Sequence, residues 1–470
     1  MTRDGAAMPA PGPASRPRRM ATLAALIVAA GITVAIIGHT IDPPPVARSR
    51  PAAMPQRFAY GPQDYAAAIA QADRHVAFGE ERVHRAPDQW AYQEYLAQAL
   101  LGRARLNGSF NDLARARAAL ARARAALARG LADAPAGAGP LLTAVVADMA
   151  VHRLAPVTPL LAQLGAAAVL DDRGERAEAT AIAGDLAFYS GRPAAARRIY
   201  AQAAALQNGA AVAVRLANWY MKMGQFDAAL AQVEFAGNSM GTPTRLFHAN
   251  LMMQRGSIEL ARGDWQAAEA CFKTADAAFP GYWRTEAFAA QMAAARGDLA
   301  AAEAGYRTIL DRQGDAPPEV MDALAALYRT QGNAAESRVW GDRAAAIWAQ
   351  RLALLPEAAV GHAVEHELVL GNPARALALA RQNVAARPYG DALVMQGWAQ
   401  LVAGQPEDAV KTITTLQASG WRTAQQYVVL SEALALLGRA DASEAARRTA
   451  LSINPRSFDP AASLLWFGNH

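Results

Sequence analysis

From about residue 64 onward, apolar and polar positions follow the period of amphipathic helices, and turns built on Gly, Asn, Asp or Pro separate the helical stretches. No stretch shows the strict apolar-polar alternation of a half-buried strand. The run at 116–128 consists mostly of alanine, a strong helix former and a weak strand former. The pattern therefore predicts an all-α protein.

The predicted helices come in pairs, and a glycine recurs in the turn within each pair. Successive turn glycines are 33 to 39 residues apart, which is enough chain for two short helices and their connections. This regularity predicts one repeated helical hairpin. The turn glycines are Gly191, Gly224, Gly263, Gly297, Gly332, Gly371, Gly404 and Gly438.

A period near 34 residues with two helices per unit resembles the tetratricopeptide repeat (TPR) family. In the best-matching unit, Gly256 stands at the close-packing position of the first helix. Ala268 and Phe272 form the A-x-x-x-F pair of the second helix, and Pro280 ends the unit. The other units match less fully, and the tryptophan of the first helix is generally missing. Partial matches are Gly184, Ala196, Tyr200, Tyr220, Ala229, Ala302, Tyr306, Tyr328, Pro388, Gly397, Ala409 and Pro455.

The resemblance implies a superhelical α-α solenoid of about eight repeats over residues 177–470, with degenerate helical repeats over 64–176. It also implies a long concave groove lined by the first helix of each pair. One position per repeat is expected to face this groove and to contact a partner protein, with Trp398 as a candidate anchor. The alternative is that these side chains are simply solvated. The positions are Asp185, Asn218, Ser257, Gln291, Ala326, Glu365, Trp398 and Glu432.

The amino-terminal segment predicts one membrane span. Residues 20–38 carry no charge, and about 20 apolar residues are needed to cross the hydrocarbon core, so an uncleaved anchor at 20–41 is expected. Arg16, Arg18 and Arg19 precede the span and favour a cytoplasmic tail at 1–19. Six prolines at 42–63 predict a stiff spacer. The expected location is the inner membrane, single-pass, with the repeats in the periplasm; the alternative is a cleaved signal and release into the periplasm.

Charge and cysteine content exclude several functions. The net charge of +5 is spread along the chain, which argues against nucleic acid as a partner. Cys271 is the single cysteine, so no internal disulfide or C-x-x-C site exists. In the helix predicted from residue 110, Arg115, Arg122 and Arg129 lie on a different face from the leucines that recur every seven residues. This face is either a solvated surface or a basic patch for lipid headgroups.

Three motifs imitate catalytic or binding sites. The G-x-S-x-G at 237–241 follows a helix, not a strand, and is interpreted as a turn between repeats. His362, Glu365 and His366 spell H-x-x-E-H, which puts both histidines on one helix face, but a third metal ligand is not evident. These side chains either bind a divalent ion without catalysis or line the groove. The scattered tryptophans are expected to fill gaps between helices, with a stacking platform as the alternative.

The sequence thus predicts a non-enzymatic scaffold or adaptor without cofactor or small-molecule substrate, which binds partner proteins in the assembly of an envelope complex. The alternative is a metal-handling accessory protein that uses His362, Glu365 and His366. No P-loop, Rossmann fingerprint or C-x-x-C motif occurs in the sequence. The identity of the partner is not encoded in a fold of this kind.

Overall fold

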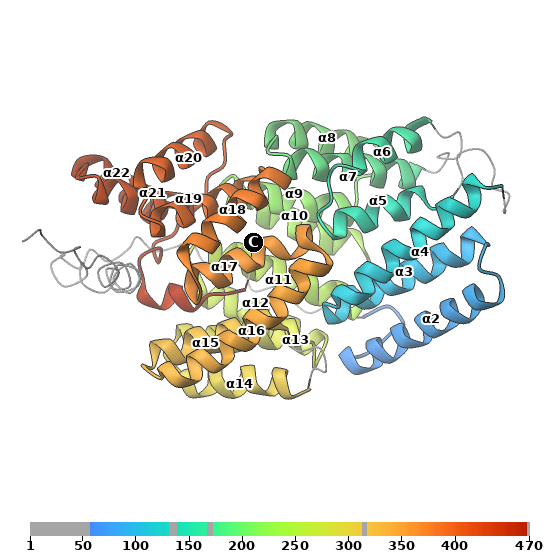
Figure 1. Ribbon diagram of the computed structural model, residues 1–470, viewed down its shortest axis with the longest axis horizontal. Helices are drawn as coiled ribbons and strands as arrows, with labels where there is room; N and C mark the ends of the chain where they lie inside the picture. Colours follow the sequence, from blue (N-terminus) through green and yellow to red (C-terminus); the bar gives the residue numbers. More distant parts are fainter. Residues whose placement is uncertain (1–56, 131–138, 167–172, 313–316, 468–470) are drawn as a thin grey trace, which may run out of the picture. The chain divides into compact units, whose positions relative to one another are not determined.

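The computed structural model describes residues 57–130, 139–166, 173–312 and 317–467. The contacts divide the chain into residues 1–42 and 43–470, and every described residue belongs to the second unit. In these stretches all regular structure is helical, which confirms the all-α prediction there (Figure 1). The helices are α2 (Tyr65–Arg85), α3 (Trp90–Asn107), α4 (Phe110–Ala128), α5 (Leu141–Ala150), α6 (Val157–Ala166), α7 (Arg173–Tyr189), α8 (Pro193–Leu206), α9 (Ala210–Lys222), α10 (Phe226–Ser239), α11 (Arg245–Ala261), α12 (Trp265–Ala278), α13 (Trp283–Ala295), α14 (Leu299–Arg312), α15 (Pro318–Thr330), α16 (Ala334–Leu354), α17 (Pro356–Val369), α18 (Pro373–Ala386), α19 (Gly390–Val402), α20 (Pro406–Ala418), α21 (Ala424–Leu436), α22 (Ala440–Ile453) and the 3₁₀ helix η2 (Pro460–Leu464).

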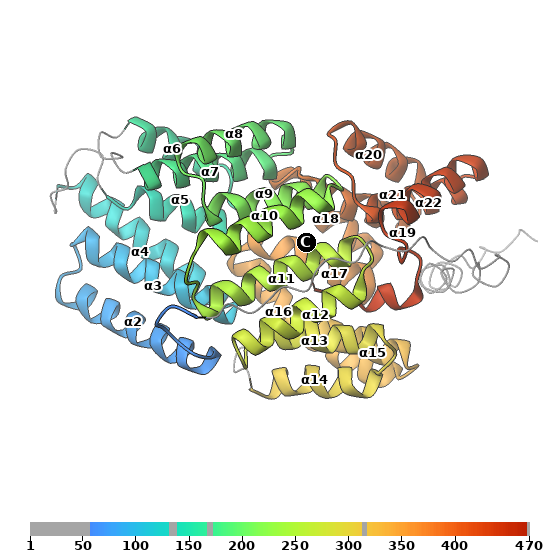
Figure 2. The ribbon, with the colours of Figure 1, turned by 180° about the vertical axis from the view of Figure 1, so that it is seen from behind.

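The helices pack as consecutive hairpins, from α3 with α4 to α21 with α22, and the same pairs can be followed from behind in Figure 2. The first helices of successive hairpins also contact one another, as α17 does α19 and α19 does α21. No comparable contact joins successive second helices in the described stretches. The first helices therefore line the inner side of the winding, and the second helices form its outer side.

The turns within the hairpins use glycine for its backbone freedom. Seven of the eight predicted turn glycines have a positive φ, which residues with a Cβ rarely adopt. Gly371 is the exception, and it is needed for space instead, because a Cβ there would overlap the carboxylate of Glu367. That carboxylate accepts a hydrogen bond from the backbone N–H of Asn372 at 2.9 Å and so closes the turn between α17 and α18.

Within a hairpin, a small residue on the first helix faces a large one on the second. A Cβ on Gly256 would overlap the ring of Phe272, which is 1% exposed, and a Cβ on Gly184 would lie 2.5 Å from the ring of Tyr200. Ala268 is fully buried between the same helices. These contacts confirm the packing roles predicted from the repeat pattern.

The basic face of α4 is used within the fold. Arg115 pairs with Glu80, Arg122 donates to the side chain of Gln93 at 3.3 Å, and Arg129 lies 3.4 Å from Asp88. All three acceptors lie on α2, α3 or their connection, so these arginines tie neighbouring helices together. Alanines make up most of the buried side of α4, and of the predicted leucines Leu120 is buried and Leu113 packs on the same core.

The winding brings hairpins far apart in the chain into contact. The indole N–H of Trp283 donates to the carbonyl of Leu106 at 3.0 Å, across 177 residues of sequence. The side chain of Asn454 donates to the carbonyl of Leu260 at 3.1 Å, across 194 residues. The inner side of the array is therefore partly closed by the chain itself.

The predicted tail at 1–19 and membrane span at 20–41 lie outside the described residues, as does most of the spacer at 42–63. Within the described ranges, no helix has both the length and the apolar character needed to cross a bilayer.

Candidate functional site

The predicted groove positions lie on the first helices α7 to α21, but they differ widely in exposure. Trp398 is 40% exposed, whereas Gln291 and Ala326 are buried. The remaining five positions are half-buried. The row is therefore open near its carboxyl-terminal end and covered in its middle.

At the start of the row, Asp185 is bonded to side chains of its own repeat and of the next one. Its carboxylate accepts hydrogen bonds from the hydroxyl of Tyr200 at 2.7 Å and from the guanidinium of Arg215 at 2.8 Å. Arg215 also pairs with Glu178 at 2.6 Å. Burial raises the pKa of Asp185 above its ordinary value, against the opposing effects of Arg215 and Tyr200. This network joins α7, α8 and α9.

In the middle of the row, Gln291 holds the carboxyl-terminal segment of the chain. Its amide nitrogen donates to the carbonyl of Phe467 at 3.1 Å, and its amide oxygen accepts from the backbone N–H of the same residue at 2.6 Å. The ring of Phe467 lies 6.0 Å from that of Phe288 and 6.5 Å from that of Tyr306. The 3₁₀ helix η2, just before this residue, contacts α13 and α15. A stretch of main chain thus occupies the inner face at this point.

The H-x-x-E-H motif on α17 is engaged with neighbouring helices. His366 Nδ1 lies 2.6 Å from a carboxylate oxygen of Asp322, whose other oxygen accepts the indole N–H of Trp348 at 2.8 Å. The His362 ring stacks on Trp348 at 5.5 Å, and its Nδ1 lies 3.7 Å from Glu365. The two histidines thus have different partners. In the described part of the chain, no three His, Cys, Asp or Glu side chains are grouped to hold a metal ion, so the metal hypothesis gains no support.

The contact between His366 and Asp322 also shifts the pKa of the imidazole. Burial lowers the pKa of His366, but the hydrogen bond and charge of Asp322 outweigh it and raise the pKa above its ordinary value. The pair is a buried link between α15 and α17, both first helices.

The other catalytic look-alikes have structural roles. Ser239 is the last residue of α10, and its hydroxyl donates to the carbonyl of Ala236. The predicted turn is therefore limited to Met240 and Gly241, because the first three residues of the motif are helical. Cys271 is buried, and burial raises the pKa of its thiol to about 12, which makes it a poor nucleophile. Most of the tryptophans are buried between helices, as predicted: Trp265, Trp283, Trp340, Trp348 and Trp421.

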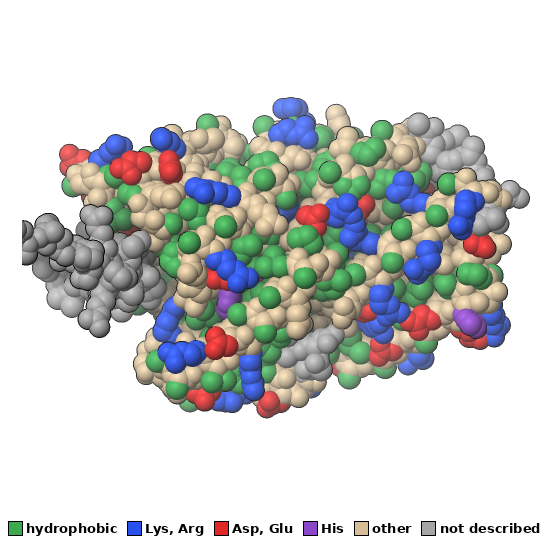
Figure 3. All heavy atoms as spheres, viewed as in Figure 1, with side chains coloured by type: hydrophobic (Ala, Val, Ile, Leu, Met, Phe, Trp, Pro, Cys, Tyr) green, Lys and Arg blue, Asp and Glu red, His purple; other side chains and the backbone are tan. Residues whose placement is uncertain are grey.

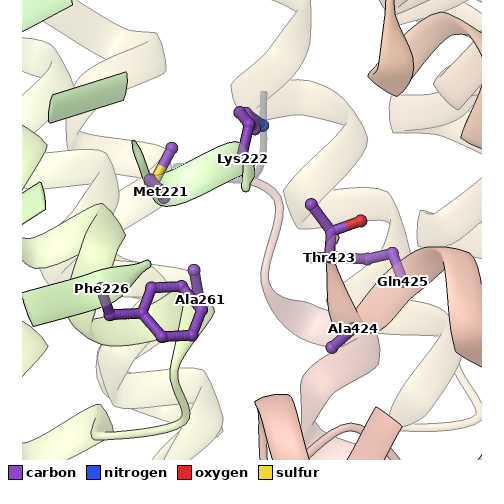
Figure 4. A pocket seen from close by; sticks show the side chains of 7 residues that line it. All are labelled: Met221, Lys222, Phe226, Ala261, Thr423, Ala424 and Gln425. Atoms are coloured by element: carbon purple, nitrogen blue, oxygen red, sulfur yellow. The ribbon is translucent and has the colours of Figure 1, made fainter. Parts of the chain in front are cut away.

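A buried ion pair that sequence reasoning missed links α9 to α19. The ammonium of Lys222 lies 2.7 Å from the carboxylate of Asp391, and the two side chains are 5% and 13% exposed. Beside it is a cavity of about 20 Å³, room for about one water molecule and far too small for a substrate (Figure 4). Its lining residues are Met221, Lys222, Phe226, Ala261, Thr423, Ala424 and Gln425.

The charged side chains on the face shown in Figure 3 are scattered, with Lys and Arg interspersed among Asp and Glu. That face therefore shows no large patch of a single sign.

Comparisons with known proteins do not establish the family of this chain. No family model matches it, and no curated protein matches it. Among solved structures it is similar to a tetratricopeptide repeat protein from Parabacteroides merdae, with 15% identity over 54% of this chain and 96% of that one. The TM-score is 0.34, a likeness too low to assign fold or function. The helical-hairpin repeat therefore rests on the helices and contacts described above.

Proposed function

We propose that the chain is a non-enzymatic TPR-type scaffold that binds partner proteins through the inner face of its first helices and serves the assembly of an envelope complex. The observation that carries the proposal is the exposure of Trp398, at 40%, on the first helix α19. The adjoining first helices α17 and α21 carry Glu365 and Glu432, both half-buried. A rigid aromatic surface beside polar groups is typical of an interface hot spot.

The chemistry of the inner face supports binding over catalysis. Asp185 is bonded to Tyr200 and Arg215, and Asp322 is bonded to His366 and Trp348. Each of these carboxylates links two or more helices. A scaffold needs such links to hold its face rigid, whereas a general acid or base needs an open path to a reacting group.

Photo-crosslinking tests the proposal directly. With p-benzoylphenylalanine in place of Trp398 in the full chain, ultraviolet light is expected to give a defined adduct with one partner protein. The matched control is the same probe at Val339, which is 47% exposed on the outer helix α16 and is expected to give no such adduct.

Trp398→Ala is expected to weaken capture of the crosslinked partner at least tenfold, about 1.4 kcal/mol, while helicity is unchanged. Equal crosslinking from positions 398 and 339 would contradict a binding role of Trp398. A loss of helicity in Trp398→Ala would also contradict it, because the side chain would then be part of the helix packing.

We also propose that residues 20–41 anchor the chain in the inner membrane and that the repeats lie in the periplasm. The uncharged run at 20–38 and the three arginines before it support this arrangement. Protease added to spheroplasts is expected to degrade the repeats and leave a short protected amino-terminal fragment. Full protection of the repeats would show the opposite orientation. An intact repeat domain in the periplasmic fraction would indicate a cleaved signal.

A further inference from the structure

After α22 the chain turns back along the inner side of the array. Leu464, at the end of η2, is 6% exposed, and Leu465 is extended, with φ −89° and ψ 95°. Leu465, Trp466 and Phe467 are partly buried and pack on the largest part of the core, to which α9 to α17 contribute. The final described residues thus pack on the array, with an extended backbone at Leu465.

Phe467 is held through its main chain by Gln291 and through its side chain by neighbouring rings. One fully buried amide side chain both donates to and accepts from the backbone of Phe467, which copies the paired bonds between strands. These two bonds are available to any extended segment at that place. The neighbouring Phe288 and Tyr306 rings add a preference for an aromatic side chain.

Residues 465–467, the segment that occupies this place, leave one hydrogen-bond donor without an acceptor in the described part of the chain. The indole nitrogen of Trp466 is buried and has no hydrogen-bond partner among the described residues, and a buried N–H without an acceptor lowers the stability of the docked state. A segment with a different residue at this point avoids that cost. A peptide without this unbonded donor can therefore bind the site more tightly than residues 465–467 do.

We propose that the inner face of α13 and α15 is a binding site for an extended segment of a partner protein with an aromatic side chain at the position of Phe467. Residues 465–467 of the chain itself occupy this site until the partner displaces them. The inference rests on the proposed scaffold function and names a site and a ligand class for it.

The tethered segment competes strongly with any free peptide. A short linker gives a bound end an effective concentration in the millimolar range, so a peptide of equal intrinsic affinity binds the unaltered chain only weakly. Weakening the resident segment removes this competition. The site should then bind the same sequence when it is supplied from outside.

The test uses the full chain with Phe467→Ala and, as probe, a fluorescent synthetic peptide with the sequence of residues 459–467. Fluorescence anisotropy is expected to show at least tenfold tighter binding to the Phe467→Ala chain than to the unaltered chain. The double variant Trp466→Ala/Phe467→Ala provides a second opened form. A probe peptide carrying alanine in place of its own phenylalanine is expected not to bind.

Adding Gln291→Ala to the opened chain is expected to weaken probe binding at least tenfold. The matched control is Gln400→Ala, which removes a 6% exposed glutamine of the first helix α19 that accepts a hydrogen bond from Thr412. This control should leave probe binding unchanged.

The inference is overturned if neither the Phe467→Ala chain nor the double variant binds the probe peptide. It is also overturned if Gln291→Ala leaves the affinity for the probe unchanged. It is also overturned if the opened and unaltered chains exchange ends to form dimers, because a second copy would then be the occupant. Crosslinking from position 398 is independent of these results. A crosslink from position 398 without probe binding would refute only the proposed site on α13 and α15. Probe binding without the crosslink would refute only the binding role of Trp398.

Discussion

Gly256→Val is expected to lower the free energy of unfolding by about 3 kcal/mol, the upper part of the range for overpacked cores. A Cβ at this position would overlap the ring of Phe272, which is 1% exposed. That ring is stacked on Phe288 with centroids 4.1 Å apart and has no open space to move into. The valine must therefore push α11 and α12 apart. Urea unfolding followed by circular dichroism measures the change.

The matched control is Gly102→Val. Gly102 also lies within a first helix, α3, but a Cβ there would meet no side chain of the described residues within 4 Å. Valine there is expected to change stability by less than about 0.5 kcal/mol, since glycine is itself a poor helix former. Equal losses in the two variants would show that close packing at Gly256 is not the cause.

Lys222→Met is expected to destabilise the chain by about 3 to 5 kcal/mol, the usual result of removing one partner of a buried ion pair. The carboxylate of Asp391, 13% exposed, would lose the ammonium that lies 2.7 Å away. The contact joins α9 to α19, and the backbone N–H of Arg422 donates to the carbonyl of Lys222 at 3.0 Å beside it. Thermal unfolding of the full chain measures the loss.

Two further variants separate charge from packing. Lys222→Met/Asp391→Leu is expected to recover most of the loss, because neither charge then remains buried alone. Lys411→Met removes an exposed ion pair with Asp408, whose nitrogen and oxygen lie 3.6 Å apart, and should cost at most about 1 kcal/mol. A loss in Lys222→Met no larger than in Lys411→Met would contradict the buried role.

Local features of the fold could be predicted because they depend on neighbours in the repeat. The positive φ of Gly191 and the contact between Gly256 and Phe272 both follow from the spacing within one hairpin. The sequence pattern likewise predicts the helix that begins at residue 110. It leaves the role of the basic face open, because the acceptors Glu80, Gln93 and Asp88 precede the helix and no repeat pattern relates them to it.

Features that depend on the winding could not be predicted. The rotation from one hairpin to the next is small and is set by packing, so a spacing of 33 to 39 residues does not say which distant hairpins meet. The pair of Lys222 with Asp391 and the bond of Gln291 to Phe467 both depend on that rotation. Similarly, the spacing of His362 and His366 predicts a shared helix face but not Asp322 on the neighbouring first helix.

The long-range contacts between hairpins change how this array responds to shortening. An open solenoid behaves as a row of nearest neighbours, so its end repeats can be removed one at a time. Here Asn454, just beyond α22, is bonded to Leu260, and Arg422, just before α21, is bonded to Lys222. Removing the chain from Arg422 onward therefore uncovers the turns after α9 and α11 as well as exposing a new end. The array should unfold cooperatively, and its halves are not independent modules for dissection.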